Sequence, residues 1–473
     1  MISKRSIDLF KKASEEIPAY RQFLQGHKLN PRDIREPADY SKVPITSKKD
    51  YLQKFRLHDT MWQGDWEGQV MYCSTSGSTG TPHYFPRNRC LAEQASHMAE
   101  EFLRNSSHGN KRTLVIMGFG MGVWIGGIFT MHAFEIAVER MSAPVAILPT
   151  GYNRTEMFKA LKILAPEYEQ TIIAGYPPFV KEIIDDAADE GVNLNNLNLR
   201  LMFAAEAFSE MFRDYVCEKA GVKNPLTDTL NIYGSADIGA MAHETPLSIL
   251  IRRLAQKEPV IFEDIFGQIE KTPTLAQYNP DFIEFEVDDG QILLTGNSSI
   301  PLIRYAIGDH GGVKSLKEIE GIFERHGTNL KEEARKAGIP FDDRPFVYVY
   351  ERTDFSTNLH GINIFPEFIR AGLANPAVSD KVTERFTMLT EYDDNHVQFL
   401  RINVELQKNV VPGEELKEDV LEAIFNGLIT KSAEFAEISG NRDGRELIKL
   451  TLWENGHKKY FDGDGKQKWV EKT

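Results

Sequence analysis

A run of small hydroxyl-bearing and glycine residues has the composition of a phosphate-binding loop. It reads Ser74, Thr75, Ser76, Gly77, Ser78, Thr79, Gly80 and Thr81, and Pro82 and His83 follow. Hydroxyl groups and free backbone N–H groups with little side-chain bulk between them can wrap an anionic phosphate chain. The Walker A loop is excluded, because it needs a lysine directly after its last glycine, where this chain has Thr81. A surface loop without a ligand is the alternative for this run taken alone.

A β-type run that ends in a carboxylate is the second candidate group. It reads Asn231, Ile232, Tyr233, Gly234, Ser235, Ala236 and Asp237. A strand end of this kind can set the Tyr233 ring against a base and the Asp237 carboxylate near a magnesium ion. An ordinary turn after a strand is the alternative.

The third group places a carboxylate directly after a glycine. Arg304 and Tyr305 precede Gly308 and Asp309. A carboxylate fixed in this way can accept hydrogen bonds from both hydroxyl groups of a ribose, so Asp309 is a candidate ribose ligand. A β-turn with a solvated aspartate is the alternative.

In this order along the chain, the three groups resemble motifs of the adenylate-forming superfamily, which contains the acyl-CoA synthetases and adenylation domains. The resemblance extends to residues 351–354, which read Glu-Arg-Thr-Asp, and to residues 465–470 near the C-terminus. It is greatest for the phenylacetate-CoA ligase-like branch. A salt-bridged linker and solvated terminal lysines are the alternatives for the last two segments taken alone.

The resemblance implies a role for each matched residue. The nucleotide-binding set is Ser74, Thr75, Ser76, Gly77, Ser78, Thr79, Gly80, Glu206, Tyr233, Gly234, Ser235, Asp309, Arg304 and Arg352. Asp237 is implied to be catalytic and to ligate magnesium, and Asp354 is implied to be the hinge before a mobile C-terminal domain. Lys466 is the implied catalytic cation, since a long cationic side chain can bridge the substrate carboxylate and the α-phosphate. Lys468 is the second candidate for that position.

The chain departs from the family pattern at three positions. His83 stands where the phosphate loop usually has a lysine, Asp237 replaces a glutamate, and Glu351 replaces a glycine. An unperturbed imidazole is mostly neutral at about pH 7, so His83 can replace the charge of the lysine only in part. The shorter acid at position 237 changes the distance to a bound metal.

A glycine-rich apolar segment is the candidate wall of the acyl pocket. Phe119, Trp124, Ala204, Ala205 and Tyr233 could form a flat slot suited to an aromatic acid. Ordinary core packing is the alternative for these residues. No residue identifies the acid.

The composition argues against several other functions. The 473-residue chain carries a formal net charge of −14 without a block of lysines or arginines, so neither nucleic acid nor an anionic membrane surface is an expected partner. Its three cysteines form no Cys-x-x-Cys pair, so no disulfide framework and no zinc site are expected. The first residues lack the apolar core of a signal peptide, which favours a cytoplasmic location. Five glycines interrupt the uncharged stretch from Leu114 to Phe134, which predicts a buried strand, a loop and a helix.

Hydrophobic spacing predicts the elements that position these groups. One helical face at the N-terminus contains Ile7, Phe10, Ala13, Ile17 and Phe23. Further along, predicted strands at 145–148, 170–174 and 199–204 alternate with predicted helices at 155–165 and 179–187. That alternation implies a largely parallel sheet covered by helices. Residues 282–295 read as a hairpin, 314–336 as a charged helical stretch and 345–350 as an apolar run.

The pattern restarts after residue 354. Residues 397–406 alternate like a strand, and residues 416–428 are spaced like a helix. We therefore expect an α/β protein of two domains. Residues 1–353 form a large adenylation domain with helix-covered mixed sheets, and residues 354–473 form a small α+β domain.

The expected function follows from the resemblance. The chain is expected to use ATP and Mg²⁺ to activate a carboxylic acid, expected to be aromatic, as an acyl-adenylate, and then to transfer the acyl group to coenzyme A. An amine, a hydroxyl group or a carrier protein is the alternative acceptor. A degenerate protein that binds nucleotide without catalysis is the alternative of another class. The oligomeric state is not legible from the sequence.

Overall fold

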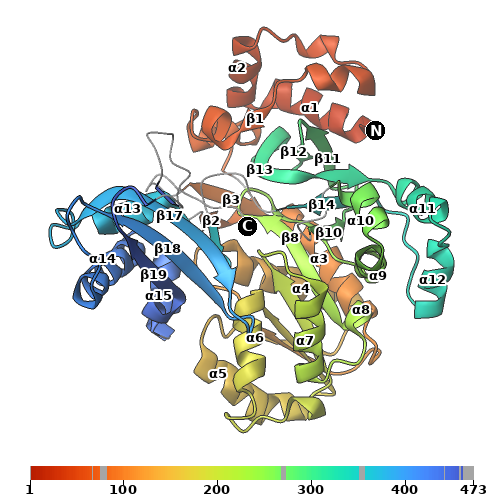
Figure 1. The fold of residues 1–473 in the computed structure, drawn as a ribbon. Helices are drawn as coiled ribbons and strands as arrows, with labels where there is room; N and C mark the ends of the chain where they lie inside the picture. The colour runs from red at the N-terminus through yellow and green to blue at the C-terminus, as the bar shows by residue number, and fades with distance from the viewer. Residues whose placement is uncertain are drawn as a thin grey trace.

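The computed structural model describes residues 2–66, 68–74, 83–267, 273–350, 357–441, 443–457 and 460–461. Figure 1 shows a large body around a twisted sheet and, beside it, a smaller part that contains the blue strands and helices of the C-terminal region.

Five parallel strands form one half of the main sheet. They are β4 (Thr113–Met117), β5 (Val145–Leu148), β6 (Gln170–Gly175), β7 (Leu199–Ala204) and β8 (Thr229–Ser235), in the spatial order β5-β4-β6-β7-β8. Helices α4 (Ile125–Met141), α5 (Arg154–Lys159), α6 (Pro177–Asp186) and α7 (Glu210–Ala220) alternate with them along the chain. Parallel strands joined in this way end at the same edge of the sheet. The candidate residues that follow β4, β7 and β8 therefore meet at that edge.

Mostly antiparallel strands complete this twelve-stranded sheet. β9 (Gly239–His243), β10 (Thr274–Gln277), β14 (Phe346–Val349), β13 (Leu302–Lys314), β12 (Gln291–Gly296) and β11 (Ile283–Asp288) follow β8 in that order, and β1 (Thr46–Ser47) pairs in parallel with β13. The first part of β13 pairs with β12, whereas Gly311 to Lys314 pair with β14. Gly308 has a φ of +91°, a value that favours glycine. Asp309 therefore lies where the strand passes from one partner to the next.

Two helices form the N-terminal end of the body, next to β12 and β13 (Figure 1). They are α1 (Lys4–Glu16) and α2 (Pro18–Gly26). The five apolar residues predicted to share a helical face are all buried. Pro18 separates the two helices, because a proline can begin a helix but cannot continue one.

A hairpin flanks the predicted phosphate loop. It consists of β2 (Gln69–Ser74) and β3 (Tyr84–Asn88), and α3 (Arg89–Arg104) continues from it. Ser74 donates its backbone N–H to the carbonyl of Val123 at 2.8 Å, which places the first loop residue beside the glycine-rich segment. Further helices of the body are α8 (Pro225–Asp228), α9 (Pro246–Lys257), α10 (Pro259–Phe266), α11 (Leu316–Arg325) and α12 (Leu330–Ala337).

The smaller part has a sheet of its own. Its strands are β17 (Val382–Tyr392), β18 (Gln398–Leu406) and β19 (Ile448–Trp453), accompanied by the hairpin β15 (Thr357–Leu359)–β16 (Ile362–Ile364). Its helices are α13 (Pro366–Leu373), α14 (Glu414–Lys431) and α15 (Ala433–Asn441). The predicted boundary at residue 354 lies outside the described residues.

The predicted α/β fold class is confirmed, and most predicted elements lie within one or two residues of the observed ones. The stretch from Leu114 to Phe134 contains β4 and the first part of α4, as expected. Within the described ranges, no helix is long and apolar enough to cross a membrane. The prediction of one helical stretch over residues 314–336 was too simple, because Gly327, with a φ of +77°, ends α11 and Asn329 caps the new helix α12.

Candidate active site

Two pairs of a tyrosine and an aspartate lie at the candidate site. The Tyr233 hydroxyl donates to Asp309 Oδ2 at 2.5 Å, and the Tyr305 hydroxyl donates to Asp237 Oδ2 at 2.8 Å. Each bond joins the end of β8 to β13, so two predicted motifs more than 60 residues apart in sequence meet here. Both aspartates are buried.

Asp237 is held mainly through its backbone. Arg87, on β3, donates to the carbonyl oxygens of Ala236 and Asp237, the latter at 3.2 Å, and Ser235 Oγ accepts the Asp237 N–H at 3.2 Å. Within the described part of the chain, no cationic side chain forms an ion pair with the Asp237 carboxylate. A buried carboxylate that has a neutral hydroxyl partner and no paired cation suits a divalent metal ion.

Arg87 was not predicted from the sequence. It is only 1% exposed, and burial lowers the pKa of its guanidinium. Its hydrogen-bond acceptor, the Asp237 carbonyl, lies 150 residues further along the chain, so the sequence around Arg87 does not indicate this role.

Burial opposes a positive charge on His83, which stands where the family's phosphate loop usually has a lysine. Burial, and then the positive charge of Lys48, lower the pKa of its imidazole, against a smaller opposite effect of Asp237. The ring lies edge-on to Phe85, with the two centroids 4.7 Å apart, and its buried Nε2 has no hydrogen-bond partner among the described residues. Burial and Lys48 therefore both favour the neutral imidazole.

Arg304 is directed toward the N-terminal segment. Its Nη1 donates to the carbonyl oxygens of Ser41 at 2.9 Å and Val43 at 2.6 Å, and its Nε lies 3.4 Å from Glu286 Oε1. The described contacts of Arg304 thus hold β13 against the residues before β1. Its predicted role in supporting the nucleotide region stays a prediction.

Glu206 lies on the loop between β7 and α7 and faces the smaller part of the molecule. Its side chain is buried and accepts hydrogen bonds from the Gly361 N–H and from Gln398 Nε2, the latter at 2.9 Å. Asn231 Nδ2 donates to the Glu206 carbonyl at 2.9 Å. The sequence placed Glu206 in the nucleotide site and gave no sign of these contacts.

An aromatic cluster lies around the candidate acyl wall. Phe119, which is completely buried, packs edge-on against Tyr176 with a centroid distance of 5.3 Å. Tyr152 stacks on Tyr176 at 5.6 Å. A methyl group added at Gly120 would lie 3.0 Å from the Tyr152 ring and 3.4 Å from the Trp124 ring, so these residues approach one another closely.

Tyr152 and Tyr176 were missed by the sequence reasoning. Each follows a glycine at or shortly after the end of a parallel strand, which is the signal that could have found them. Of the other predicted pocket residues, Ala204 ends β7 and is half-buried, whereas Ala205 follows the strand, is exposed and has a φ of +74°.

Several predicted site residues lie outside the described residues and stay predictions. They are Thr75, Ser76, Gly77, Ser78, Thr79, Gly80, Arg352, Asp354, Lys466 and Lys468. Among the residues that the structure does describe, no group of three or more histidine, cysteine, aspartate or glutamate side chains could hold a metal ion.

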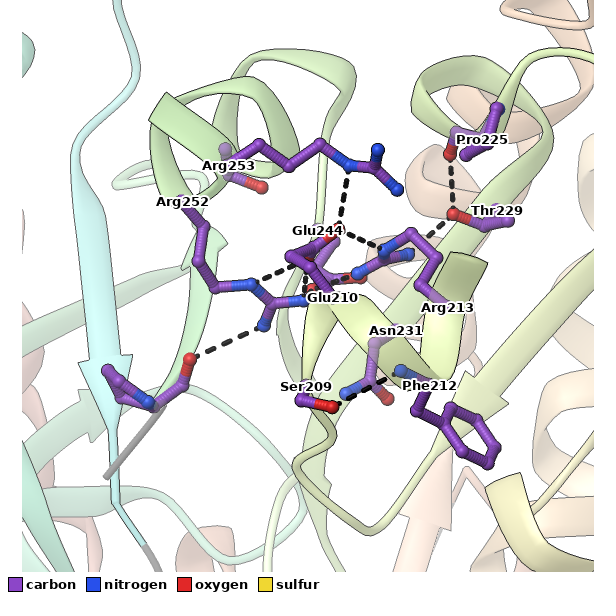
Figure 2. A network of polar contacts seen from close by, with 12 residues as sticks. Ser209, Glu210, Phe212, Arg213, Pro225, Thr229, Asn231, Glu244, Arg252 and Arg253 are labelled. Carbon is purple, nitrogen blue, oxygen red and sulfur yellow. Dashed lines mark hydrogen bonds and ion pairs between the residues drawn. The ribbon is translucent and has the colours of Figure 1, made fainter. Parts of the chain in front are cut away.

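A buried ion network lies at the other end of β8 (Figure 2). Arg213 donates to Glu244 Oε1 and Oε2, both at 2.8 Å, and to Glu210 Oε2 at 3.0 Å. Arg252 also contacts both glutamates, and the less buried Arg253 donates to Glu210 Oε2 at 2.7 Å. Arg213 also donates to Thr229, the first residue of β8, so the network ties α7 and α9 to the strand that carries Tyr233.

The chain is similar to known CoA ligases in sequence and in fold. No protein-family model matches the chain. It is 22% identical over 427 residues to the phenylacetate-coenzyme A ligase of Aromatoleum evansii. The alignment covers 88% of this chain and 84% of that protein. It is 22% identical over 408 residues to the phenylacetate-coenzyme A ligase of Escherichia coli K12, with coverages of 84% and 80%.

Among solved structures, the chain is similar to 2-hydroxyisobutyryl-CoA ligase in the thioesterification state, in complex with 2-HIB-AMP and CoA. The superposition covers 99% of this chain and 89% of the ligase chain. The TM-score is 0.68 at 16% identity. The same enzyme in the postadenylation state with 2-HIB-AMP gives 0.52 at 15% identity.

The chain therefore has the fold of the adenylate-forming ligases, the class of enzyme expected from the motifs. These two sequence relatives are phenylacetate-CoA ligases, which confirms the expected resemblance to that branch.

Proposed function

We propose that this protein activates a carboxylic acid with ATP and transfers the acyl group to coenzyme A. In the first step the acid carboxylate attacks the α-phosphorus of ATP, and pyrophosphate leaves. In the second step the thiol sulfur attacks the acyl carbonyl, loses its proton, and AMP leaves. The observation that carries the proposal is the meeting of Asp309 and Asp237, each bonded to a tyrosine of the other's strand, in a chain similar to phenylacetate-CoA ligases.

Asp309 and Tyr233 are proposed to bind the ribose and base end of the nucleotide. The 2.5 Å bond from Tyr233 orients the Asp309 carboxylate, which can accept further hydrogen bonds from ribose hydroxyls. Asp237 is proposed to hold Mg²⁺, which would neutralise phosphate charge when bound. Tyr305 fixes the direction of that carboxylate.

Lys48 is proposed to provide positive charge at the phosphate end of the site. It directly follows β1, whose residues Thr46 and Ser47 pair with Tyr305 and Ala306. Its charge acts on His83, the residue that replaces the usual loop lysine. If this is right, Lys48→Met raises the KM for ATP several-fold more than the exposed neighbour change Lys49→Met does. Equal effects of the two changes would contradict the role.

An aromatic acid is the proposed substrate class. Phe119, Tyr152 and Tyr176 form a packed aromatic cluster at the carboxyl ends of β4, β5 and β6. Aromatic side chains favour offset or edge-on contacts with another ring. An amine, a hydroxyl group or a carrier protein is kept as the alternative acceptor for the acyl group.

The test is acid-dependent exchange of pyrophosphate into ATP over a panel of aromatic and aliphatic acids, followed by product analysis with coenzyme A. We expect exchange and an acyl-CoA product with an aromatic member of the panel. Exchange without any thioester would favour the alternative acceptors. A flat result over the whole panel would leave a nucleotide-binding protein without catalysis.

Lys466 gives a second test of the first step. We expect Lys466→Ala to abolish exchange while ATP binding, measured by calorimetry, is retained. Exchange at the normal rate would show that another cation serves this step, and Lys468→Ala is the matched variant to compare.

A further inference from the structure

The loop between β15 and β16 lies directly on the body of the protein. A methyl group added at Gly361 would lie only 2.6 Å from the Tyr176 ring, so the backbone of this loop and the aromatic cluster are in contact. Gly361 has a φ of +81°, which also favours glycine. The smaller part of the molecule is therefore docked against the wall of the candidate acyl site.

Glu206 joins the two parts at this contact. Its Oε1 accepts the Gly361 N–H, and its Oε2 accepts Gln398 Nε2 at 2.9 Å. Gln398 is only 3% exposed and is itself held, because its Oε1 accepts the His360 N–H at 2.5 Å and its Nε2 also donates to the Tyr392 hydroxyl at 2.9 Å. Donors from a loop and a strand of the smaller part thus converge on one carboxylate of the body.

Contacts within the large body fix the backbone of Glu206. Ala205 has a φ of +74°, an uncommon value for a residue with a side chain, and Asn231 donates to the Glu206 carbonyl. Four residues further on, Glu210 is fixed by the buried arginines of the ion network. The conformation of the loop that carries Glu206 is therefore set by contacts within the large body and does not depend on the smaller part.

The docked arrangement has a counterpart among solved structures. The similarity is greater to the thioesterification state of 2-hydroxyisobutyryl-CoA ligase, with a TM-score of 0.68, than to its postadenylation state, with 0.52. Because the two are states of one enzyme, we infer from the higher score that the docked arrangement belongs to thioester formation.

We propose that Glu206 is a positioning residue for the second half-reaction, which holds the smaller part over the acyl site by accepting the Gly361 N–H and the Gln398 amide. The inference rests on the proposed function. When the smaller part moves away from the body, both hydrogen bonds to the Glu206 carboxylate break. The strength of this contact therefore sets the rate of thioester formation relative to adenylation.

An exchange of the two side chains tests the contact. Gln398→Glu places two carboxylates against each other, and Glu206→Gln turns an N–H toward the Gln398 amide. Hydrogen bonds to a charged group contribute enough that each single variant is expected to lower the ratio of thioester formation to pyrophosphate exchange roughly 10- to 100-fold.

The double variant again pairs each donor with an acceptor among the contacts described above. The new amide at 206 can accept the Gly361 N–H and donate to the new carboxylate at 398, which also accepts the His360 N–H and the Tyr392 hydroxyl. We expect its ratio to return to within about threefold of the wild-type ratio. Because the ratio is taken within each variant, an effect of Glu206→Gln on adenylation itself cancels.

Asn395→Asp is the matched control, since it adds the same charge on an exposed turn three residues from Gln398. We expect it to leave the ratio unchanged. Unchanged ratios in both single variants, or single defects that the double variant does not repair, would overturn the proposal.

A measurement of domain placement separates this inference from the proposed function. Fluorophores on the exposed Cys90 and on a cysteine introduced by Glu418→Cys report the distance between the parts by energy transfer. The single variants are expected to shift this distance and the double variant to restore it, even if the wild-type protein makes no thioester. An identical distance in all variants would contradict the positioning role, whereas a missing thioester with the expected shifts would contradict only the proposed acceptor.

Discussion

The two ends of β8 hold buried polar clusters that are built in opposite ways. At its start, the network of Figure 2 sets the carboxylates of Glu210 and Glu244 against the guanidinium groups of Arg213 and Arg252. At its end, the carboxylates of the candidate site bond to tyrosine hydroxyls. The first cluster pairs two buried carboxylates with two buried guanidinium groups, whereas the Asp237 carboxylate of the second is bonded to the neutral hydroxyl group of Tyr305.

We expect this difference to separate a structural cluster from a functional one. Buried charges are tolerated when they are paired and hydrogen-bonded, and a paired cluster has no capacity left for a ligand. A carboxylate held by a neutral hydroxyl group retains both its charge and free acceptor positions. The network is therefore expected to control stability, and the aspartates are expected to control nucleotide chemistry.

Glu244→Gln is expected to have the largest effect. The change leaves two buried guanidinium groups with one carboxylate, so the free energy of unfolding in urea should fall by about 3–5 kcal/mol. Arg253→Gln, at a position that is 25% exposed, is the control and should cost below about 1 kcal/mol. Similar losses for both would mean that the network is not a balanced unit.

Asp237→Asn is expected to have the opposite effect, with little loss of stability and a large loss of activity. The variant keeps the size of the side chain and an acceptor for the Tyr305 hydroxyl, so stability should change little. Without the negative charge, acid-dependent pyrophosphate exchange should fall roughly 100- to 1,000-fold. Exchange at the wild-type rate would remove Asp237 from the chemistry, and a large fall in melting temperature would make it a structural residue.

Acid should weaken the network. Burial alone would raise the pKa of Glu210, but Arg213, Arg252 and Arg253 outweigh it and lower the pKa from 4.5 to about 2. The stability that this ion pairing contributes is present above pH 4.5 and is lost as the pH falls toward 2, by up to about 3 kcal/mol. Unfolding in urea at a series of pH values should give a flatter curve for Glu210→Gln than for the wild type. Parallel curves would contradict the lowered pKa.

Tyr305→Phe is expected to have the smallest effect. It removes one hydrogen bond to Asp237, so exchange should slow by about 5- to 10-fold. Tyr40→Phe is a matched control, since it removes a buried hydroxyl bond to Thr295 at 2.9 Å on the neighbouring strand. An equal loss of exchange in both variants would show that Tyr305 acts through packing alone.

The candidate residues that could be predicted from the sequence are those with a polar or aromatic side chain at the end of an apolar run. Tyr233, Asp237 and Asp309 could be found because each follows or ends an apolar run, and the structure brings them together. The strands could be placed because their apolar runs are short and are bounded by glycine or polar residues.

Residues that act at a distance could not be predicted. Arg87 serves a turn 150 residues away, and Glu206 meets a strand 192 residues further along the chain. No local pattern in the sequence encodes such a pairing, because it depends on how the elements pack. For the same reason, Arg304 could be recognised as a motif residue while its partners at Ser41 and Val43 could not.

The pairing of the N-terminal segment with β12 and β13 has a consequence for synthesis on the ribosome. Tyr40 bonds to Thr295, Thr46 to Ile303 and Arg304 to Val43, so these partners lie 255 to 261 residues apart. At about 5–20 residues per second, the first helices leave the ribosome on the order of 10–50 s before their partners exist. Their apolar face must stay uncovered during that time, so a nascent chain is expected to depend on chaperones until the strand that carries Asp309 has been made.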